Sequence, residues 1–273
     1  MTELLKIEWL KLKNYTAFKV LAIFFGLGVI ATNYVVYIIN REVVQQVPVA
    51  GMVTFTPYSF DMTWHTTSYA SGCILLLPAM LLAILITNEY GFKTHRQNII
   101  DGMTRQQFIG VKLMLALIFA LVSMVLVFFT ALVFGLFSGT SFSFNGIANV
   151  GYFFLKALTY NLFAILVSVL VKRTGFAIGL LFIYLGGENF VSQLLWGLSI
   201  KLKSLGKTDL GNMGDYLPLN AADGLLEFPE NTVKSLSKTI MPHDITWLVF
   251  VLAIVYLVLF FIWARSKFIT SDL

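Results

Sequence analysis

Two ionisable residues lie deep in apolar stretches, where a charge could take part in proton transfer or in contact with a substrate. Lys156 lies in the run at about 147–171, and Glu188 lies in the run at about 176–200. At ~1.5 Å per helical residue they are ~14 Å and ~18 Å from the expected outer ends of these helices. A lone charge at mid-bilayer costs at least ~2.5–3.5 kcal/mol, so we expect an ion pair or a water-filled cavity.

Asn161 and Asn189 add polar groups near this expected pair. Two alternatives stay open: a purely structural pair, or a helix break at Gly186-Gly187 that places Glu188 on an outer re-entrant turn. An intramembrane enzyme needs paired catalytic groups on facing spans, and only Lys156 and Glu188 are available. A proton-coupled transporter would use the same two residues, although many such carriers have repeated halves and this sequence shows none.

No other residue pattern predicts catalysis. The histidines at 65, 95 and 243 are far apart and form no HExxH zinc motif. The tripeptide GKT at 206–208 resembles the end of a phosphate-binding loop, but Lys201 stands where that motif requires its first glycine. We therefore expect no catalytic residue, metal or cofactor in this chain.

The elements that must position these residues are membrane helices. Of the 273 residues, 58% are hydrophobic and 12% are charged, whereas a soluble domain carries about 25% charged residues. Apolar runs of ~20 residues cross a bilayer as helices, and their continuity argues against a β-barrel. We expect an all-α membrane protein with one transmembrane domain over 1–273 and six spans, at about 16–39, 66–88, 108–137, 147–171, 176–200 and 245–264.

The placement of charge predicts the side that each segment faces. Six spans put both termini on one side, and the segments on that side hold twelve basic and five acidic residues. Basic residues favour the cytoplasmic ends of spans, so we expect both termini in the cytoplasm and the chain in the plasma membrane. The net charge of +5 is then a topology signal, because nucleic-acid binding needs a concentrated basic patch on a soluble face.

The segment before the first span predicts an amphipathic helix. Residues 1–15 place Leu5, Trp9 and Leu12 at i, i+4 and i+7, on one helical stripe flanked by lysines. Such a helix lies in the interface of the inner leaflet. A charged helical extension of the first span is the alternative.

Two outer segments lie between spans. The loop 40–65 carries Tyr58, Phe60 and Trp64, and we expect these aromatic side chains to anchor the membrane interface. The segment 201–244 is the largest outer one and contains Gly, Pro, acidic residues and the run YLPLNAADGLLEF.

The polar stretch between the second and third spans contains two helix-start signals. Thr94 to Gln97 fits the capping-box pattern S/T-x-x-E/Q, and Thr104 to Gln107 fits it again at the start of the third span. Gly102 stands between them, where a terminating glycine belongs. We therefore expect a short helix at about 95–101, and the alternative is a solvated loop with one helical turn.

The side chains of this short helix suit a surface position. Ile99 and Ile100 are its only apolar side chains. His95, Arg96, Asn98 and Asp101 are then left to face a polar partner. A plain linker would not need two start signals with a stop between them.

This stretch resembles the cytoplasmic loop of type-2 ABC transporter permeases, of the kind that export bacitracin or lantibiotics. That loop has an acidic residue, a Thr, a Gly or Pro, a Ser/Thr-Arg pair, and a Lys seven residues after the Arg. The family often has Gly directly before the Thr, where this chain has Lys93. Length, six spans, an amphipathic lead-in and the YLPLN-like run extend the resemblance over the whole chain. The matching positions here are Glu89, Thr94, Gly102, Thr104-Arg105 and Lys112.

The resemblance implies a function and partners. The chain would be the permease subunit of an ATP-driven exporter of an amphiphilic or hydrophobic substrate, such as a peptide antibiotic or a lipid. Its short helix would be a coupling helix that docks on a separate soluble ABC ATPase, present in two copies, which binds ATP and Mg²⁺. A second permease copy or a paralogue and membrane lipids are further partners, and nucleic acid is not. The residues that this role implies are Glu89, Thr94, His95, Arg96, Asn98, Asp101 and Arg105.

Two other functions remain as alternatives. One is the proton-coupled secondary transporter that would use Glu188 and Lys156. The other is a membrane scaffold that transports nothing. Neither is excluded by the residues alone.

Overall fold

The computed structural model describes residues 2–39, 57–206, 210–226 and 245–271. All regular structure in these ranges is helical, which confirms the predicted all-α class. Five helices are long and apolar enough to cross a bilayer, and α3 (Phe60–Gly72) with α4 (Leu76–Gly91) forms a sixth if the two count as one span. The five are α2 (Thr16–Ile38), α6 (Arg105–Phe137), α7 (Ala148–Val171), α8 (Thr174–Ser204) and α11 (Thr246–Thr270).

The second span is not the single helix predicted at 66–88. It starts earlier and consists of α3 and α4, which are bent by 42° relative to one another. Pro78 in the first turn of α4 accounts for the break, because it has no N–H and its ring would clash with the carbonyl of Ile74 in a continuous helix. α3 is rich in buried Thr and Ser residues, so hydropathy alone did not reveal where it begins.

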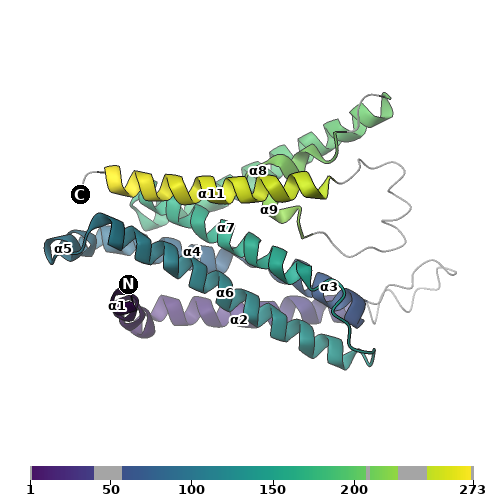
Figure 1. The fold of residues 1–273 in the computed structure, drawn as a ribbon, viewed down its shortest axis with the longest axis horizontal. Helices are drawn as coiled ribbons and strands as arrows, with labels where there is room; N and C mark the ends of the chain where they lie inside the picture. The colour runs from purple at the N-terminus through teal and green to yellow at the C-terminus, as the bar shows by residue number, and fades with distance from the viewer. Residues whose placement is uncertain (1, 40–56, 207–209, 227–244, 272–273) are drawn as a thin grey trace.

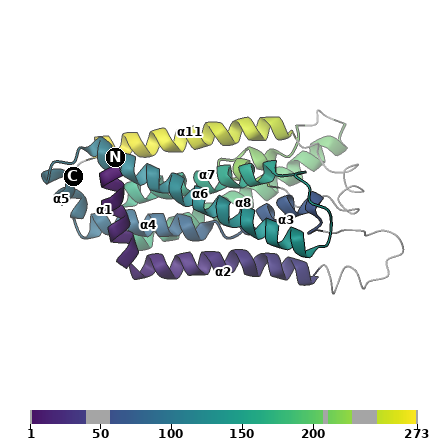
Figure 2. The same cartoon turned by 60° about the horizontal axis from the view of Figure 1, so that its bottom comes forward.

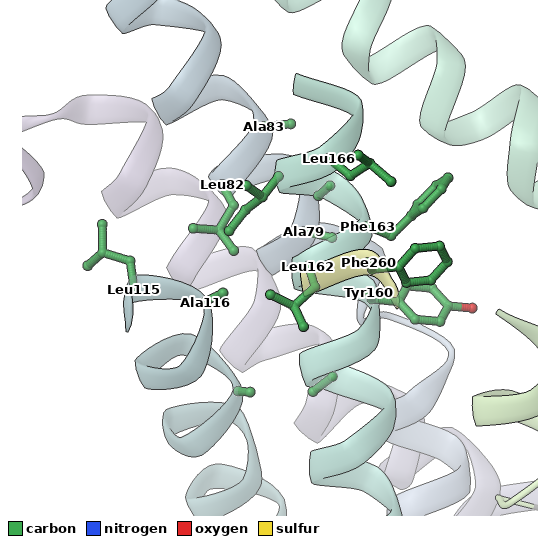
Figure 3. Packing of buried hydrophobic residues seen from close by; sticks show 14 of the residues in the cluster. Ala79, Leu82, Ala83, Leu115, Ala116, Tyr160, Leu162, Phe163, Leu166 and Phe260 are labelled. Atoms are coloured by element: carbon green, nitrogen blue, oxygen red, sulfur yellow. The ribbon is translucent and has the colours of Figure 1, made fainter. Parts of the chain in front are cut away.

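The core is built around α7. In the most apolar stretch of α7, 72% of the residues are buried. In the corresponding stretches of the other four single-helix spans, 17–28% are buried. α4, α6 and α11 all pack on α7. Figure 3 shows the buried residues at this centre, where alanines of α4 and α6 lie near the larger side chains of α7 and α11. Small residues let membrane helices approach closely.

The two ends of the bundle differ. The N terminus, the C terminus and α5 (Thr94–Ile100) lie together at one end, called here the α5 end (Figure 1). α3 and the connection between α6 and α7 lie at the opposite end, called the α3 end. Both termini at one end agree with an even number of spans.

The first helix, α1 (Thr2–Asn14), crosses the direction of the bundle at the α5 end (Figure 2). The predicted stripe is only partly correct, because Leu12 is buried but Trp9 is exposed. Glu8 is buried beside Leu12, one helical turn away. The buried face of α1 therefore carries a charge, and its partners are described below.

The outer segments turn toward the protein. Tyr58, Phe60 and Trp64 are buried, so their predicted role as interface anchors is wrong: Tyr58 packs on Phe134 and Trp64 stacks on Phe128. Before the last span, η2 (Met213–Tyr216) and α9 (Asn220–Asp223) fold back against the bundle. The rest of the predicted outer loops, at 40–56 and 227–244, and positions 207 and 208 of the GKT tripeptide lie outside the described residues.

Candidate functional site

α5 joins α4 to α6 at the α5 end and ends as predicted. It covers Thr94–Ile100, within one residue of the predicted 95–101. Gly102 has a φ of 101°, a left-handed conformation that glycine adopts without strain. The amide of Gly102 donates to the Ile99 carbonyl (3.1 Å), and the amide of Met103 donates to the Asn98 carbonyl (3.0 Å). These bonds satisfy the last carbonyls of the helix and confirm the stop signal.

The start of α5 differs from the prediction. The N-cap is Lys93, with a φ of 57°, and it makes no side-chain cap. Thr94 is already inside the helix, and its hydroxyl donates to the Glu89 carbonyl (3.4 Å), so the first capping box is wrong. A left-handed backbone conformation costs a residue other than glycine ~1–2 kcal/mol. The glycine that resembling permeases place before the threonine would adopt this conformation freely.

The start of α6 confirms the second capping box. The Thr104 hydroxyl accepts from the Gln107 amide (3.2 Å), and the Gln107 side-chain oxygen accepts from the Thr104 amide (2.9 Å). The next residue, Arg105, donates to the Ile269 and Ser271 carbonyls at 2.8 and 3.1 Å. Arg105 therefore ties the end of α11 to α6, rather than pointing freely toward a partner.

His95 was also predicted to face a partner, and the structure buries it. Its Nδ1 lies 3.0 Å from the Glu89 carbonyl oxygen, and its ring lies 4.6 Å from the Tyr90 ring. The face of α5 that carries His95 packs on α4, and the composition of the helix does not indicate this direction. His95 is thus a contact that fixes α5 on α4.

The exposed surface of α5 mixes apolar and charged side chains. Phe92, just before the helix, and Ile100, its last residue, are 78% and 77% exposed. Arg96 and Asp101 are exposed and Asn98 is half-buried, and Gln97 donates to the Asp101 carboxylate at 3.0 Å. The sequence analysis names Ile99 and Ile100 as the apolar side chains of this helix and does not single out Phe92, which lies just before it.

A buried ion cluster of Glu8, Lys11, Glu89 and Lys112 lies beside α5. The sequence analysis does not single out Glu8 or Lys11. Lys112 of α6 is 2% exposed, and its Nζ lies 2.6 Å from the Glu8 carboxylate of α1 and 2.8 Å from that of Glu89 of α4. Lys11 contacts the same two carboxylates at 2.9 and 3.1 Å. Glu89 was expected to serve docking, but its carboxylate is held here. The signal was Lys112 itself, because a lysine in an apolar run requires acidic partners.

The four intramembrane polar residues do not form one site. The expected pair of Lys156 and Glu188 is wrong: Lys156 Nζ lies 3.2 Å from Asp223, and Glu188 accepts from two backbone amides of the segment around α9. The Asn161 amide donates to the Ala116 carbonyl (3.0 Å), while Asn189 is exposed and bonds within its own helix.

The proposed helix break near Glu188 is also wrong. α8 continues through Gly186-Gly187 from Thr174 to Ser204. The reason for both errors is that α9 returns to the bundle and supplies the partners of both charges. Sequence reasoning placed residues 201–244 entirely outside the membrane helices, so Asp223 was not considered.

The family model described as ABC-2 family transporter protein matches residues 4–187, which is more than half of the chain. The chain belongs to the ABC-2 family. It is therefore an ABC transporter permease and a multi-pass membrane protein. No curated protein matches the sequence significantly.

The matched part of this ABC-2 permease contains α1, α5 and the buried ion cluster. Burial raises the pKa of the Glu8 carboxyl, but attraction and hydrogen bonds from Lys112 and Lys11 outweigh it and hold this pKa below its ordinary value. Burial lowers the pKa of the Lys11 ammonium, but Glu89 and Glu8 raise it further, above its ordinary value. Both pKa shifts favour the ionised forms of these two side chains in the folded protein.

We expect Glu8→Gln to lower the melting temperature of the ABC-2 permease at neutral pH and to matter less in acid. The pKa of Glu8 in the folded protein lies below its unfolded value of ~4.3. The stabilisation that the ionised Glu8 carboxylate gives the folded protein is therefore complete above the unfolded pKa. It is lost as the pH falls through the pKa of Glu8 in the folded protein. The measurement is thermal unfolding of both proteins from neutral to about pH 3, and the difference should close below about pH 4.

Glu3→Gln is the matched control for this experiment. Glu3 pairs with Lys6 on the exposed side of the same helix, and exposed pairs contribute little. Its effect should be small at every pH. A Glu8→Gln difference that widens in acid would contradict the assignment.

Proposed function

We propose that a separate ABC ATPase subunit drives this permease by docking on α5, and that the α5 end faces the cytoplasm. The observation that carries the proposal is the exposed surface of α5. Phe92 and Ile100 extend from a polar, charged end of the bundle, and large exposed apolar side chains rimmed by polar groups mark protein contacts. The ABC-2 family implies such an ATPase partner.

The contacts of α5 support a coupling role. His95 and Thr94 fix the helix to α4, and Arg105 joins the start of α6 to the end of α11. Lys112 joins α6 to α1 and α4 through charged bonds. A force applied to α5 would therefore reach several membrane helices through short, bonded connections.

Assembly and substrate follow from the same proposal. Two permease copies, or one copy with a paralogue, would enclose the pathway, and two ATPase subunits would bind ATP and Mg²⁺. The proposed substrate is amphiphilic or hydrophobic, such as a peptide antibiotic or a lipid, and the proposed direction is export. A groove between α6, α7 and α11 supports this substrate class, because leucines line it and Arg265, Thr104 and Gln107 lie along it.

The secondary-transporter alternative would use Lys156 and Glu188. The structure instead gives each of them a different partner in the outer segment. No observation in the described residues favours proton coupling over an ATPase.

We expect the double substitution Phe92→Ser and Ile100→Ser to shift stimulation of the ATPase to much higher permease concentrations. Removing two apolar anchors from a docking surface costs about 2 kcal/mol or more, which is roughly a thirtyfold loss of affinity. The measurement is ATP hydrolysis by the purified ATPase as the permease variant is titrated in lipid vesicles. Ser266→Ala, an exposed position near the end of α11 and outside α5, should retain full stimulation.

Thermal unfolding should be unchanged in both variants, since both sites are exposed. Stimulation by the double variant at unchanged permease concentrations would show that the ATPase does not use α5. The helix would then be a linker.

A further inference from the structure

The described part of the outer segment includes a short element that is buried against the bundle. Leu219, Ala221, Ala222 and Leu226 are all almost completely buried, and α9 packs on α7, α8 and α11. α9 itself has four residues. A helix this short has no stability of its own, so its position depends on tertiary contacts.

The first contact is a charged one from α8. One oxygen of the Glu188 carboxylate accepts from the Leu219 amide (2.6 Å) and from the Asn220 amide (2.9 Å). The Asn220 side chain donates to the Glu188 carbonyl at 3.4 Å. Bonds from backbone amides to a carboxylate are among the stronger hydrogen bonds in proteins.

The second contact is a charged one from α7, at the other end of α9. Lys156 Nζ lies 3.2 Å from Asp223. The Tyr160 hydroxyl reaches both carboxylate oxygens of Asp223, at 3.0 and 2.9 Å. α3 has Gly72 beside Lys156, where an added Cβ would lie 3.1 Å from Nζ. The sequence thus leaves room for this lysine to reach Asp223.

We propose that residues 219–226 form a plug that opens as a unit, and that Glu188 and Lys156 are the latches that keep it closed. Both latches bind the same short segment, and each comes from a different membrane helix. Between the latches lie only the small side chains of Ala221 and Ala222, while the leucines of the plug, Leu219, Leu225 and Leu226, are buried at its two ends, so apolar packing and the two latches hold it together. Separation of α7 from α8 would therefore strain both latches and free the plug without unfolding the bundle.

This inference goes beyond the proposed ATPase coupling and does not depend on it. The test uses the purified permease alone, in detergent, with its single exposed cysteine removed by Cys73→Ser. Ala222→Cys then reports opening of the plug, Ala264→Cys reports opening of the bundle, and Leu210→Cys is an exposed control. Ala222 and Ala264 are both fully buried. The readout is the rate of modification by a polar thiol reagent.

We expect the cysteine at 222 to react slowly in the reference protein and at least about tenfold faster after Glu188→Leu or Lys156→Met, since local opening sets its rate. Glu188→Gln keeps an acceptor and should give an intermediate rate. Asn189→Ala, on the same helix but exposed, should change nothing. The cysteine at 264 should stay slow in every variant, and the one at 210 should stay fast.

Two results would overturn the proposal. One is a rate at 222 that stays slow in both latch variants, which would mean that packing alone holds the segment. The other is a rate at 264 that rises in parallel with that at 222, including in Glu188→Gln, which would mean that the charges stabilise the whole bundle. Since no ATPase is present, either result leaves the coupling experiment on α5 unaffected.

Discussion

Lys112→Met is expected to destabilise the folded permease strongly. The ammonium group of Lys112 is buried and pairs with both Glu8 and Glu89. Its loss leaves two buried carboxylates with only Lys11, which is partly exposed. Removing one member of a buried ion pair costs ~3–5 kcal/mol, mainly because the remaining charge is desolvated without a partner. Thermal unfolding in detergent measures the effect.

Two further variants make this result specific. Replacing the carboxylates as well, with Glu8→Gln and Glu89→Gln, should restore much of the stability lost in Lys112→Met, because neutral groups cost less to bury. Lys6→Met removes only an exposed pair with Glu3 and should have a small effect. A triple variant less stable than Lys112→Met would argue that the carboxylates have other roles in the fold.

Trp64→Ala is expected to have a comparable effect at the opposite end of the bundle. Trp64 is 0% exposed, its Nε1 donates to the Ser143 carbonyl at 2.9 Å, and its ring stacks on Phe128 at 5.3 Å. Truncating a large buried aromatic side chain costs ~3–5 kcal/mol. The expected result is a large fall in the melting temperature of the purified protein.

Trp247→Ala is the matched control, because this tryptophan is 70% exposed near the start of α11. Its effect should stay within about 0.5 kcal/mol, as for most surface substitutions. Trp64→Phe, which keeps most of the volume but loses the hydrogen bond, should lie between the two. Equal effects of Trp64→Ala and Trp247→Ala would mean that Trp64 anchors the membrane interface, as its position in the sequence suggested.

Local patterns in the sequence predicted the helices well. The apolar runs predicted α2, α6, α7, α8 and α11, because a span depends only on its own composition. The second capping box predicted the start of α6 at Thr104, and Gly102 predicted the end of α5. These features need no knowledge of distant residues.

The errors concern the direction of a turn and one partner that is distant in the chain. His95 is 5% exposed because α5 turns onto α4, and no local pattern shows that direction. Lys156 was assigned to the nearest deep acid, Glu188, although its partner Asp223 comes from a segment treated as an outer loop. The first capping box failed because Lys93 adopts a left-handed conformation, which sequence propensity would assign to glycine.

The position of Lys112 also sets an order of events during synthesis. Lys112 follows Glu8 by 104 residues and Glu89 by 23. When Glu8 leaves the ribosome, Lys11 follows three residues later, but Lys112, the buried one of its two lysine partners, has not been made. α2, α3 and α4 must all emerge before the start of α6 does. During that time the buried ion cluster of α1 lacks Lys112 and cannot be completed. The N-terminal helix is thus made first, and its ion cluster is completed late, after the start of α6 has entered the bundle.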